Sequence, residues 1–402
     1  MRREHMSQRD IRGACCQRDV DLHIVMGRNA QSQTCRADGA EIGGLQIFLP
    51  QMDAICLMLD RQPPVIVETM GTINLARQAI TQAIYNHKSV ITANKDLLAI
   101  DGPRLAQLAK SRHVDFLYEA SVAGGIPILR VLSSSLATDQ ISQVTGIING
   151  TANYILSAMT SNNVSYDKAL MNAQKKGYAE ANPTNDVKGI DTANKLSILS
   201  QFAFGKALDP NKLGIRGIEN ITAAQLASAN HFGYTIKLLA IAKRLANKLY
   251  TFVGPTLIAH NDPLAQVDGV QNAVAVESNA LGSSVYTGPG AGAKPTANSI
   301  LSDLAAAAND ILDYDCGSEF NNYHNELEPC SLTTVPQSYL VTTYGASAKP
   351  NSTVNWQGEF NGNNYWSGLT PVISHQELES LLKSFPKSSA VSYLPVYNTA
   401  KL

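Results

Sequence analysis

Strands and helices alternate through the first third of the chain, and this alternation constrains the fold more than any other feature. Short apolar runs typical of strands occupy residues 20–26, 63–69, 89–94 and 115–121. Helical patterns separate the later strands, at residues 74–87 and 101–113. Strands that are almost continuously apolar are buried on both faces, as in a parallel sheet covered by helices. We therefore expect an α/β domain of the doubly wound, Rossmann-like type, which binds ligands beyond the carboxyl ends of its strands.

The pattern changes from about residue 139 onward. A strand at 140–150 precedes two helices across 151–177, and further strands are expected near 234–244, 250–259 and 271–278. This second region is typical of an α+β domain, after which the chain returns to the first domain through a helix near 296–312. We place the domain boundaries at 1–138, 139–295 and 320–402.

The last 80 or so residues form a small α/β domain of different composition, rich in Asn, Ser, Tyr and Gly. Strands are expected near 338–344 and 391–397, with a helix near 375–384.

Charge and composition exclude several classes of protein. The 402 residues carry 32 Lys and Arg against 33 Asp and Glu, so no basic surface for nucleic acid or an anionic membrane is predicted. No apolar run approaches the roughly 20 residues that span a bilayer, and the charged start lacks the apolar core of a secretory signal. The six cysteines are scattered without zinc-binding spacing, as is typical of reduced thiols. We expect a cytoplasmic protein that binds small molecules.

The segment from Ala173 to Lys195 concentrates the candidate chemistry, because it contains the four candidate site residues Glu180, Asp186, Asp191 and Lys195. Asp191 and Lys195 are four residues apart at the start of a predicted helix, so they share a face. Ile198, Leu199 and Phe202 lie on that same face, which places the lysine on an apolar stripe. Spacing alone leaves two interpretations open: an ordinary surface ion pair, or a desolvated lysine that moves protons.

This segment resembles the signature of homoserine dehydrogenases, and the resemblance extends from about residue 20 to about residue 310. Similar blocks are VIVETMG (65–71), VITANK (90–95), YEASVAGGIPI (118–128), GIINGTANYIL (146–156), YTIKLLAIAKR (234–244) and GPGAGAKPTANSILSDL (288–304). The family interconverts L-homoserine and L-aspartate 4-semialdehyde with NAD or NADP in methionine and threonine biosynthesis. The resemblance implies the same reaction here, with the second domain carrying catalysis and forming a homodimer.

The resemblance also implies roles for the charged residues. Lys195 matches the proton donor and acceptor at the substrate oxygen, and Asp191 its polar partner. Glu180 matches the residue that holds the amino end of the substrate, and Asp186 falls at a further acidic position of the pocket. The sequence departs from the family at Asn182, where an aspartate is usual.

The cofactor residues implied by the resemblance follow predicted strands. Thr69 to Gly71 end one strand and Lys95 follows the next, while Gly292 matches a glycine that approaches the cofactor. NADP or NAD is expected, and Arg28 after the 20–26 strand favours NADP slightly, because an arginine there can meet the 2′-phosphate.

A monovalent-cation loop is the last site that the resemblance implies. The carboxylate of Glu119 and the backbone carbonyls of Val122, Gly124 and Ile126 match its ligands for a sodium ion. Oxygen-only ligands suit a hard cation.

One feature of the family is missing from the sequence. No G-x-G-x-x-G motif precedes residue 60, so the first strand and phosphate loop are expected to be absent, leaving the domain incomplete with a gap between the flanking strands. Either the start codon is placed too late or the protein is genuinely short. The alternative function is therefore a catalytically impaired pseudoenzyme or dimerisation partner. The tail is interpreted as a degenerate, ACT-like regulatory domain without the usual ligand-binding motif.

Overall fold

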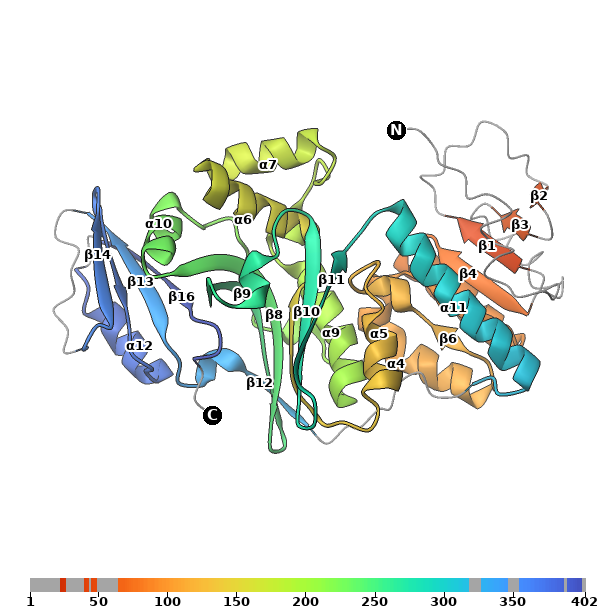
Figure 1. Cartoon of the computed structure of the whole chain (residues 1–402). Coiled ribbons are helices and arrows are strands. Elements are labelled where there is room, and N and C mark those ends of the chain that lie inside the picture. Colours follow the sequence, from red (N-terminus) through yellow and green to blue (C-terminus); the bar gives the residue numbers. More distant parts are fainter. Residues whose placement is uncertain are drawn as a thin grey trace. The chain divides into compact units, whose positions relative to one another are not determined.

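The structure is a computed structural model that describes residues 22–26, 40–42, 45–48, 64–317, 327–345, 354–386 and 389–399. The chain divides into two compact units, which are described separately. Unit 1 comprises residues 1–137, 197–209 and 291–324, and unit 2 comprises residues 138–196, 210–290 and 325–402. Figure 1 gives the element labels along the chain.

The centre of unit 1 is a six-stranded sheet in the order β2-β3-β1-β4-β5-β6. Its strands are β1 (Leu22–Met26), β2 (Ala40–Ile42), β3 (Leu45–Phe48), β4 (Val65–Thr69), β5 (Ser89–Thr92) and β6 (Phe116–Leu117). All neighbours are parallel except the pair of β2 and β3. The parallel sheet predicted from the apolar runs is confirmed.

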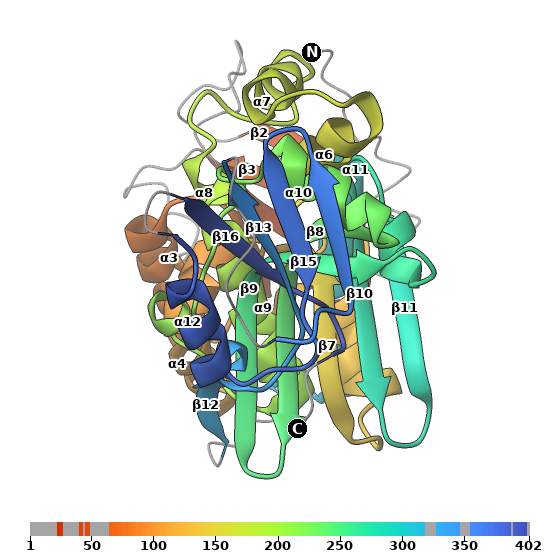
Figure 2. The same cartoon turned by 90° about the vertical axis from the view of Figure 1, so that its left-hand side faces the viewer.

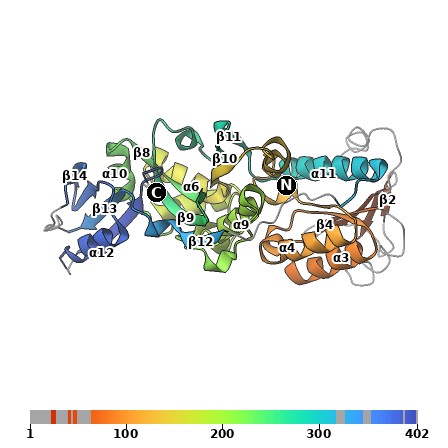
Figure 3. The same ribbon diagram turned by 90° about the horizontal axis from the view of Figure 1, so that it is seen from below.

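Helices cover both faces of this sheet. Figure 3 shows α3 (Ile73–Tyr85) and α4 (Lys95–Ser111) on one side of β4 and α11 (Ala293–Asp313) on the other. Side chains from alternate strand positions, Val65 and Val67, pack against Leu304 and Ala307 of α11. Unit 1 also contains the short α5 (Ile128–Arg130), a π-helical turn at Val131–Ser135, and the last half of α9 (Ile190–Phe204).

The prediction that the sheet has a gap between the strands flanking the missing strand was wrong. β1 pairs directly with β4 over five residues, from Leu22 opposite Val65 to Met26 opposite Thr69. The strands that would flank a missing strand therefore satisfy each other's backbone groups. The phosphate loop was expected to be absent because no G-x-G-x-x-G motif precedes residue 60, and this stays a prediction, since residues 1–21 lie outside the described residues.

Two predicted boundaries in unit 1 were also wrong. Helix α4 begins at Lys95 rather than at residue 101, because the Asn94 side chain accepts the Leu97 N–H and caps the helix there. Pro103 lies inside the helix without ending it. The strand expected over residues 115–121 is only β6, because Glu119–Ser121 form a 3₁₀ turn.

Unit 2 is built on a second six-stranded sheet in the order β11-β10-β7-β8-β9-β12 (Figure 2). Its strands are β7 (Ile141–Ile147), β8 (Tyr234–Leu245), β9 (Lys248–Ala259), β10 (Gln271–Ser278), β11 (Gly282–Pro289) and β12 (Glu328–Ser331). Neighbours are antiparallel except that β12 is parallel to β9. The helices are α6 (Gly150–Asn162), α7 (Tyr166–Lys175), α8 (Thr184–Val187), α10 (Ala223–His231) and the first half of α9. Helices α8 and α10 and strands β11 and β12 were not predicted from the sequence.

The tail forms a four-stranded antiparallel sheet within unit 2, in the order β14-β15-β13-β16. The strands β13 (Tyr339–Tyr344), β14 (Gly358–Gly362), β15 (Tyr365–Leu369) and β16 (Ala390–Pro395) accompany the helix α12 (His375–Lys383). Tyr339 and Val341 pack with Leu378 of α12 in one core, whereas Thr342 bonds Ser367, which Ser228 of α10 also bonds. Strands β14 and β15 were not predicted, and an ACT-like identity for this sheet remains a prediction.

Within the described residues, no helix has the length and apolar character needed to cross a membrane. The two cysteines that fall there, Cys316 and Cys330, are free thiols, as predicted.

Candidate active site

Lys195 lies in the second turn of α9 and is held by two contacts inside unit 2. Its Nζ atom lies 2.8 Å from Asp191 Oδ2 and donates to the Ile148 carbonyl at 2.8 Å. The side chains of Lys195 and Asp191 are only 12% and 8% exposed. The interpretation as an ordinary surface ion pair is therefore wrong, because such pairs are solvated and weakly ordered.

Asn149, which was not among the predicted site residues, connects two of the acidic residues. Its Nδ2 group donates to Asp186 Oδ1 at 2.7 Å and to Asp191 Oδ2 at 2.9 Å. Its Oδ1 atom accepts the Ala152 N–H at 2.8 Å and caps α6. One buried amide thus joins Asp186, Asp191 and, through Asp191, the Lys195 ammonium.

We predict that Asn149→Ala lowers kcat/KM by about tenfold or more, because a misplaced polar group at a reacting centre is costly. Loss of the α6 cap adds a stability cost of about 1 kcal/mol. Asn149→Ser separates the two effects, because serine still caps a helix but cannot donate to both carboxylates. Steady-state kinetics and thermal unfolding of both variants measure the outcome. If Asn149→Ala leaves kcat/KM unchanged, the role of Asn149 as a bridge between Asp186 and Asp191 is contradicted.

Glu180 lies apart from this cluster in the described contacts. It is exposed, and its backbone carbonyl accepts the Gln174 side chain at 3.1 Å. The neighbouring Asn182 accepts the Thr184 hydroxyl at 2.6 Å and so forms a turn at the start of α8. Such a turn needs only a side-chain oxygen that accepts a hydrogen bond, which asparagine and aspartate both provide. The turn is therefore kept although asparagine stands where the family usually has aspartate.

The expected cofactor residues of unit 1 lie at element ends. Thr69 is the last residue of β4, Gly71 has a φ of +67°, and Lys95 is the first residue of α4. Gly292 caps the start of α11 with a φ of +114°, a region that favours glycine. Because β4 and β5 are parallel, Thr69 at the end of β4 and Lys95 shortly after β5 belong to the carboxyl ends of adjacent strands.

The proposed cation loop follows β6 and contains an αL turn, with positive φ at Ala123 and Gly124. Both oxygens of the buried Glu119 carboxylate accept backbone N–H groups, from Leu129 and Arg130, each at 2.8 Å. Burial raises the pKa of the Glu119 carboxyl to about 7. The loop therefore holds its carboxylate at the start of α5.

Two residues one turn apart on α11 fix this loop. The Ser299 hydroxyl donates to the Gly124 carbonyl at 2.6 Å. Asp303, which is fully buried, accepts the Glu119 N–H at 2.8 Å and pairs with Arg130 at 2.6 Å. Burial raises the pKa of the Asp303 carboxyl to about 6. Neither Ser299 nor Asp303 was predicted from the sequence to have a role.

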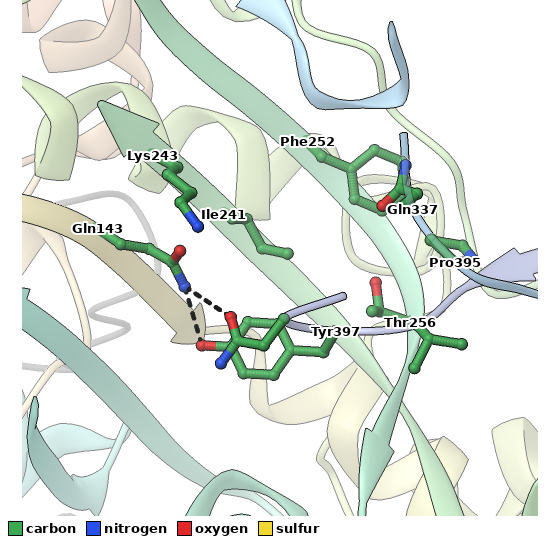
Figure 4. Close-up of a pocket in the computed structure, with 10 residues that line it drawn as sticks. Gln143, Ile241, Lys243, Phe252, Thr256, Gln337, Pro395 and Tyr397 are labelled. Atoms are coloured by element: carbon green, nitrogen blue, oxygen red, sulfur yellow. Dashed lines mark hydrogen bonds between the residues drawn. The ribbon is translucent and has the colours of Figure 1, made fainter. Parts of the chain in front are cut away.

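Two hollows in unit 2 lie away from the predicted residues. The one in Figure 4 has about 20 Å³ of free volume, which suits a water molecule. The Gln143 amide crosses it to bond Tyr397 and Asn398. The other has about 170 Å³, but the Lys237 ammonium at its wall already donates to Asn153, Val267 and Asp268.

Comparison with known proteins identifies the family. The protein-family model described as homoserine dehydrogenase matches residues 127–305. The family model described as the homoserine dehydrogenase NAD binding domain matches residues 6–119. The homoserine dehydrogenase of Lactococcus lactis is 42% identical over 335 residues, which cover 83% of this chain and 77% of that protein. The chain belongs to the homoserine dehydrogenase family. The predicted function, a homoserine dehydrogenase dependent on NAD or NADP, is confirmed, and nothing in these matches supports the pseudoenzyme alternative.

Further relatives agree on the family. The homoserine dehydrogenase of Mycobacterium leprae is 47% identical over 249 residues, which cover 61% of this chain and 56% of that protein. The solved homoserine dehydrogenase from Thiobacillus denitrificans matches with a TM-score of 0.78 at 29% identity, covering 94% of this chain and 99% of that one. A hyperthermophilic archaeal homoserine dehydrogenase in complex with NADPH shares the fold, with a TM-score of 0.58 at 22% identity over 72% of this chain and 98% of that one.

Proposed function

We propose that Lys195 transfers the proton in the homoserine dehydrogenase reaction. In the direction of reduction, a bound nicotinamide cofactor would supply the hydride that the aldehyde carbon of L-aspartate 4-semialdehyde takes up. The Lys195 ammonium donates a proton to the carbonyl oxygen, so that the C=O bond becomes the C–O–H group of L-homoserine. In the reverse direction the neutral amine takes the hydroxyl proton back.

The geometry around Lys195 supports this role. Its contacts to Asp191 and to the Ile148 carbonyl use two of the three N–H donors of the ammonium among the described residues. One donor is left for a substrate oxygen, and the low exposure of the side chain limits competition from water. Asp191, itself held by Asn149, fixes the direction of the amine. This restrained amine is the observation on which the proposal rests.

The remaining acidic residues are proposed to bind the amino end of the substrate. A carboxylate complements an ammonium through charge-assisted hydrogen bonds. Glu180 is exposed and so accessible to a ligand, and Asp186 is oriented by its bond from Asn149. We propose Glu180 for the amino group and Asp186 as a second acidic contact.

The cofactor is proposed to contact Thr69, Gly71, Lys95 and Gly292. Thr69 ends β4 and Lys95 comes shortly after β5, so both belong to the carboxyl ends of parallel strands, where ligands bind in such sheets. Gly71 and Gly292 have backbone conformations that favour a residue without a side chain, which lets a ligand approach the backbone. Arg28, which favoured NADP, lies outside the described residues, so the choice between NAD and NADP stays a prediction.

We also propose a sodium ion at the loop of Glu119, Val122, Gly124 and Ile126. The donor set fits a hard cation, because it offers oxygen atoms only. The Gly124 and Ile126 carbonyls each accept one hydrogen bond, from Ser299 and Ile128, and a carbonyl oxygen has a second lone pair for a cation.

The homodimer, the cytoplasmic location and a regulatory role for the tail also stay predictions.

The formation of reduced cofactor by the 402-residue chain tests this function. We expect NADPH or NADH to accumulate when L-homoserine is present, and none to accumulate when it is omitted or replaced by L-serine, which is one methylene shorter. If L-homoserine causes no reduction of either NADP or NAD, the proposal is contradicted and the pseudoenzyme alternative is favoured.

A further inference from the structure

The strand β4 carries a buried carboxylate that neither the fold nor the proton transfer explains. Glu68 is the fourth residue of the apolar strand VIVET and is only 1% exposed. A buried carboxylate is costly unless hydrogen bonds satisfy it. Its neighbour across the sheet is Thr92, the last residue of β5. The carboxylate therefore lies at the carboxyl end of the parallel pair.

Both oxygens of Glu68 accept short hydrogen bonds, each linked to a different loop. Oε1 accepts the Met70 N–H at 2.6 Å, in the loop after β4. Oε2 accepts the Thr92 hydroxyl at 2.6 Å, and Thr92 Oγ1 in turn accepts the Asn94 N–H at 3.0 Å, in the loop after β5. Burial raises the pKa of Glu68, and bonds from Thr92, Met70, Asn94 and Gly71 oppose that rise.

Asn94 extends the network back to the first loop. Its Nδ2 group donates to the Thr72 carbonyl at 3.1 Å, and its Oδ1 atom accepts the Leu97 N–H to cap α4. Thr72 is itself the N-cap residue, directly before the start of α3 at Ile73. The chain of bonds Glu68–Thr92–Asn94–Thr72 thus joins the loop after β4, which contains Gly71, to the loop after β5, which ends directly before Lys95.

We propose that Glu68 is a positioning residue for cofactor binding, which sets the separation of the β4 and β5 loops through Thr92 and Asn94. This inference rests on the proposed cofactor role of those loops. A carboxylate suits the position because it accepts on both oxygens, whereas an amide accepts on one only. The residue acts through the loops and need not touch the cofactor.

The same sheet offers a matched control at its opposite edge. Asp115, directly before β6, is also buried at 3% exposure and accepts the Ser89 hydroxyl at 3.3 Å and the Gly317 N–H at 2.8 Å. Ser89 is the first residue of β5, so this pair lies at the amino ends of the strands. Removing either carboxylate costs stability, but only Glu68 adjoins the loops at the ligand-binding edge.

Fluorescence titration of the full chain with NADPH and NADH tests the inference, with thermal unfolding measured in parallel. We expect Glu68→Gln and Thr92→Val to raise the dissociation constant of the cofactor by about tenfold or more. Thr92→Ser keeps the hydroxyl and should restore binding to within about twofold of the wild type. Asp115→Asn should lower the melting temperature yet leave the dissociation constant unchanged.

The outcomes separate this inference from the proposed function. If the cofactor has the same dissociation constant in Glu68→Gln, in Asp115→Asn and in the wild type, the positioning role of Glu68 is overturned. If Lys95→Ala weakens cofactor binding while Glu68→Gln does not, the loops bind cofactor but Glu68 does not position them. If neither cofactor binds the wild-type chain, the cofactor role of both loops is wrong, and the inference falls with it.

Discussion

Replacing Lys195 with alanine is expected to lower kcat by about two to four orders of magnitude, the usual contribution of a positioned acid or base. The reason is that the substrate oxygen then has no adjacent proton donor. Asp191 keeps its bond from Asn149 after the change, so its carboxylate remains satisfied and the fold should persist. Steady-state kinetics with saturating homoserine, together with a thermal melt, measure the two effects separately.

Two further variants make this prediction specific. Lys195→Arg keeps the positive charge but cannot release a proton near neutral pH, so it should be nearly as inactive as the alanine variant. Lys188→Ala removes an exposed lysine from the same segment and should leave kcat within about twofold. High activity in Lys195→Arg would show that the residue contributes charge rather than a proton.

Replacing Asp303 with alanine is expected to produce the largest loss of stability, about 3 kcal/mol in unit 1. The change leaves the Glu119 N–H without its acceptor inside the protein and removes the partner of Arg130. It also removes one of the two anchors that α11 provides to the 119–130 loop, the other being Ser299. Denaturant unfolding followed by fluorescence and by circular dichroism measures the loss.

Ser302 provides the matched control for Asp303, because it is the preceding residue of α11 and its side chain is exposed. Ser302→Ala should change the free energy of unfolding by no more than about 0.5 kcal/mol. A loss of similar size in both variants would indicate a general effect on the helix. An unchanged free energy of unfolding in Asp303→Ala would contradict the role assigned to the buried ion pair.

The core strands of both units could be predicted because burial leaves a direct mark in sequence. Residues 65–69 and 89–92 are apolar runs between turn residues, and they form β4 and β5. Strand β11 was missed because GSSVYTGP is a half-exposed edge strand with small residues and no continuous apolar pattern. The start of α4 was missed because Gly102 and Pro103 are usual at helix ends, whereas here they lie inside the helix.

The site could be predicted only in part, because hydrogen-bond partners distant in sequence leave no pattern. The offset from Asp191 to Lys195 correctly predicted their contact. The bridge from Asn149 could not be derived, because 37 residues separate it from Asp186. Glu68 did leave a signal: a carboxylate within an apolar strand at its carboxyl end indicates a satisfied, functional position. The gap in the sheet was predicted from the absence of the first strand, and the prediction was wrong because β1 and β4 pair directly.

An experimental structure of the chain with L-homoserine and oxidised cofactor bound tests the central claim most directly. The account predicts that Lys195 Nζ lies about 2.6–3.2 Å from the substrate hydroxyl oxygen while it keeps its contact to Asp191. An amine that faces solvent, with the hydroxyl bound by other groups, would contradict it.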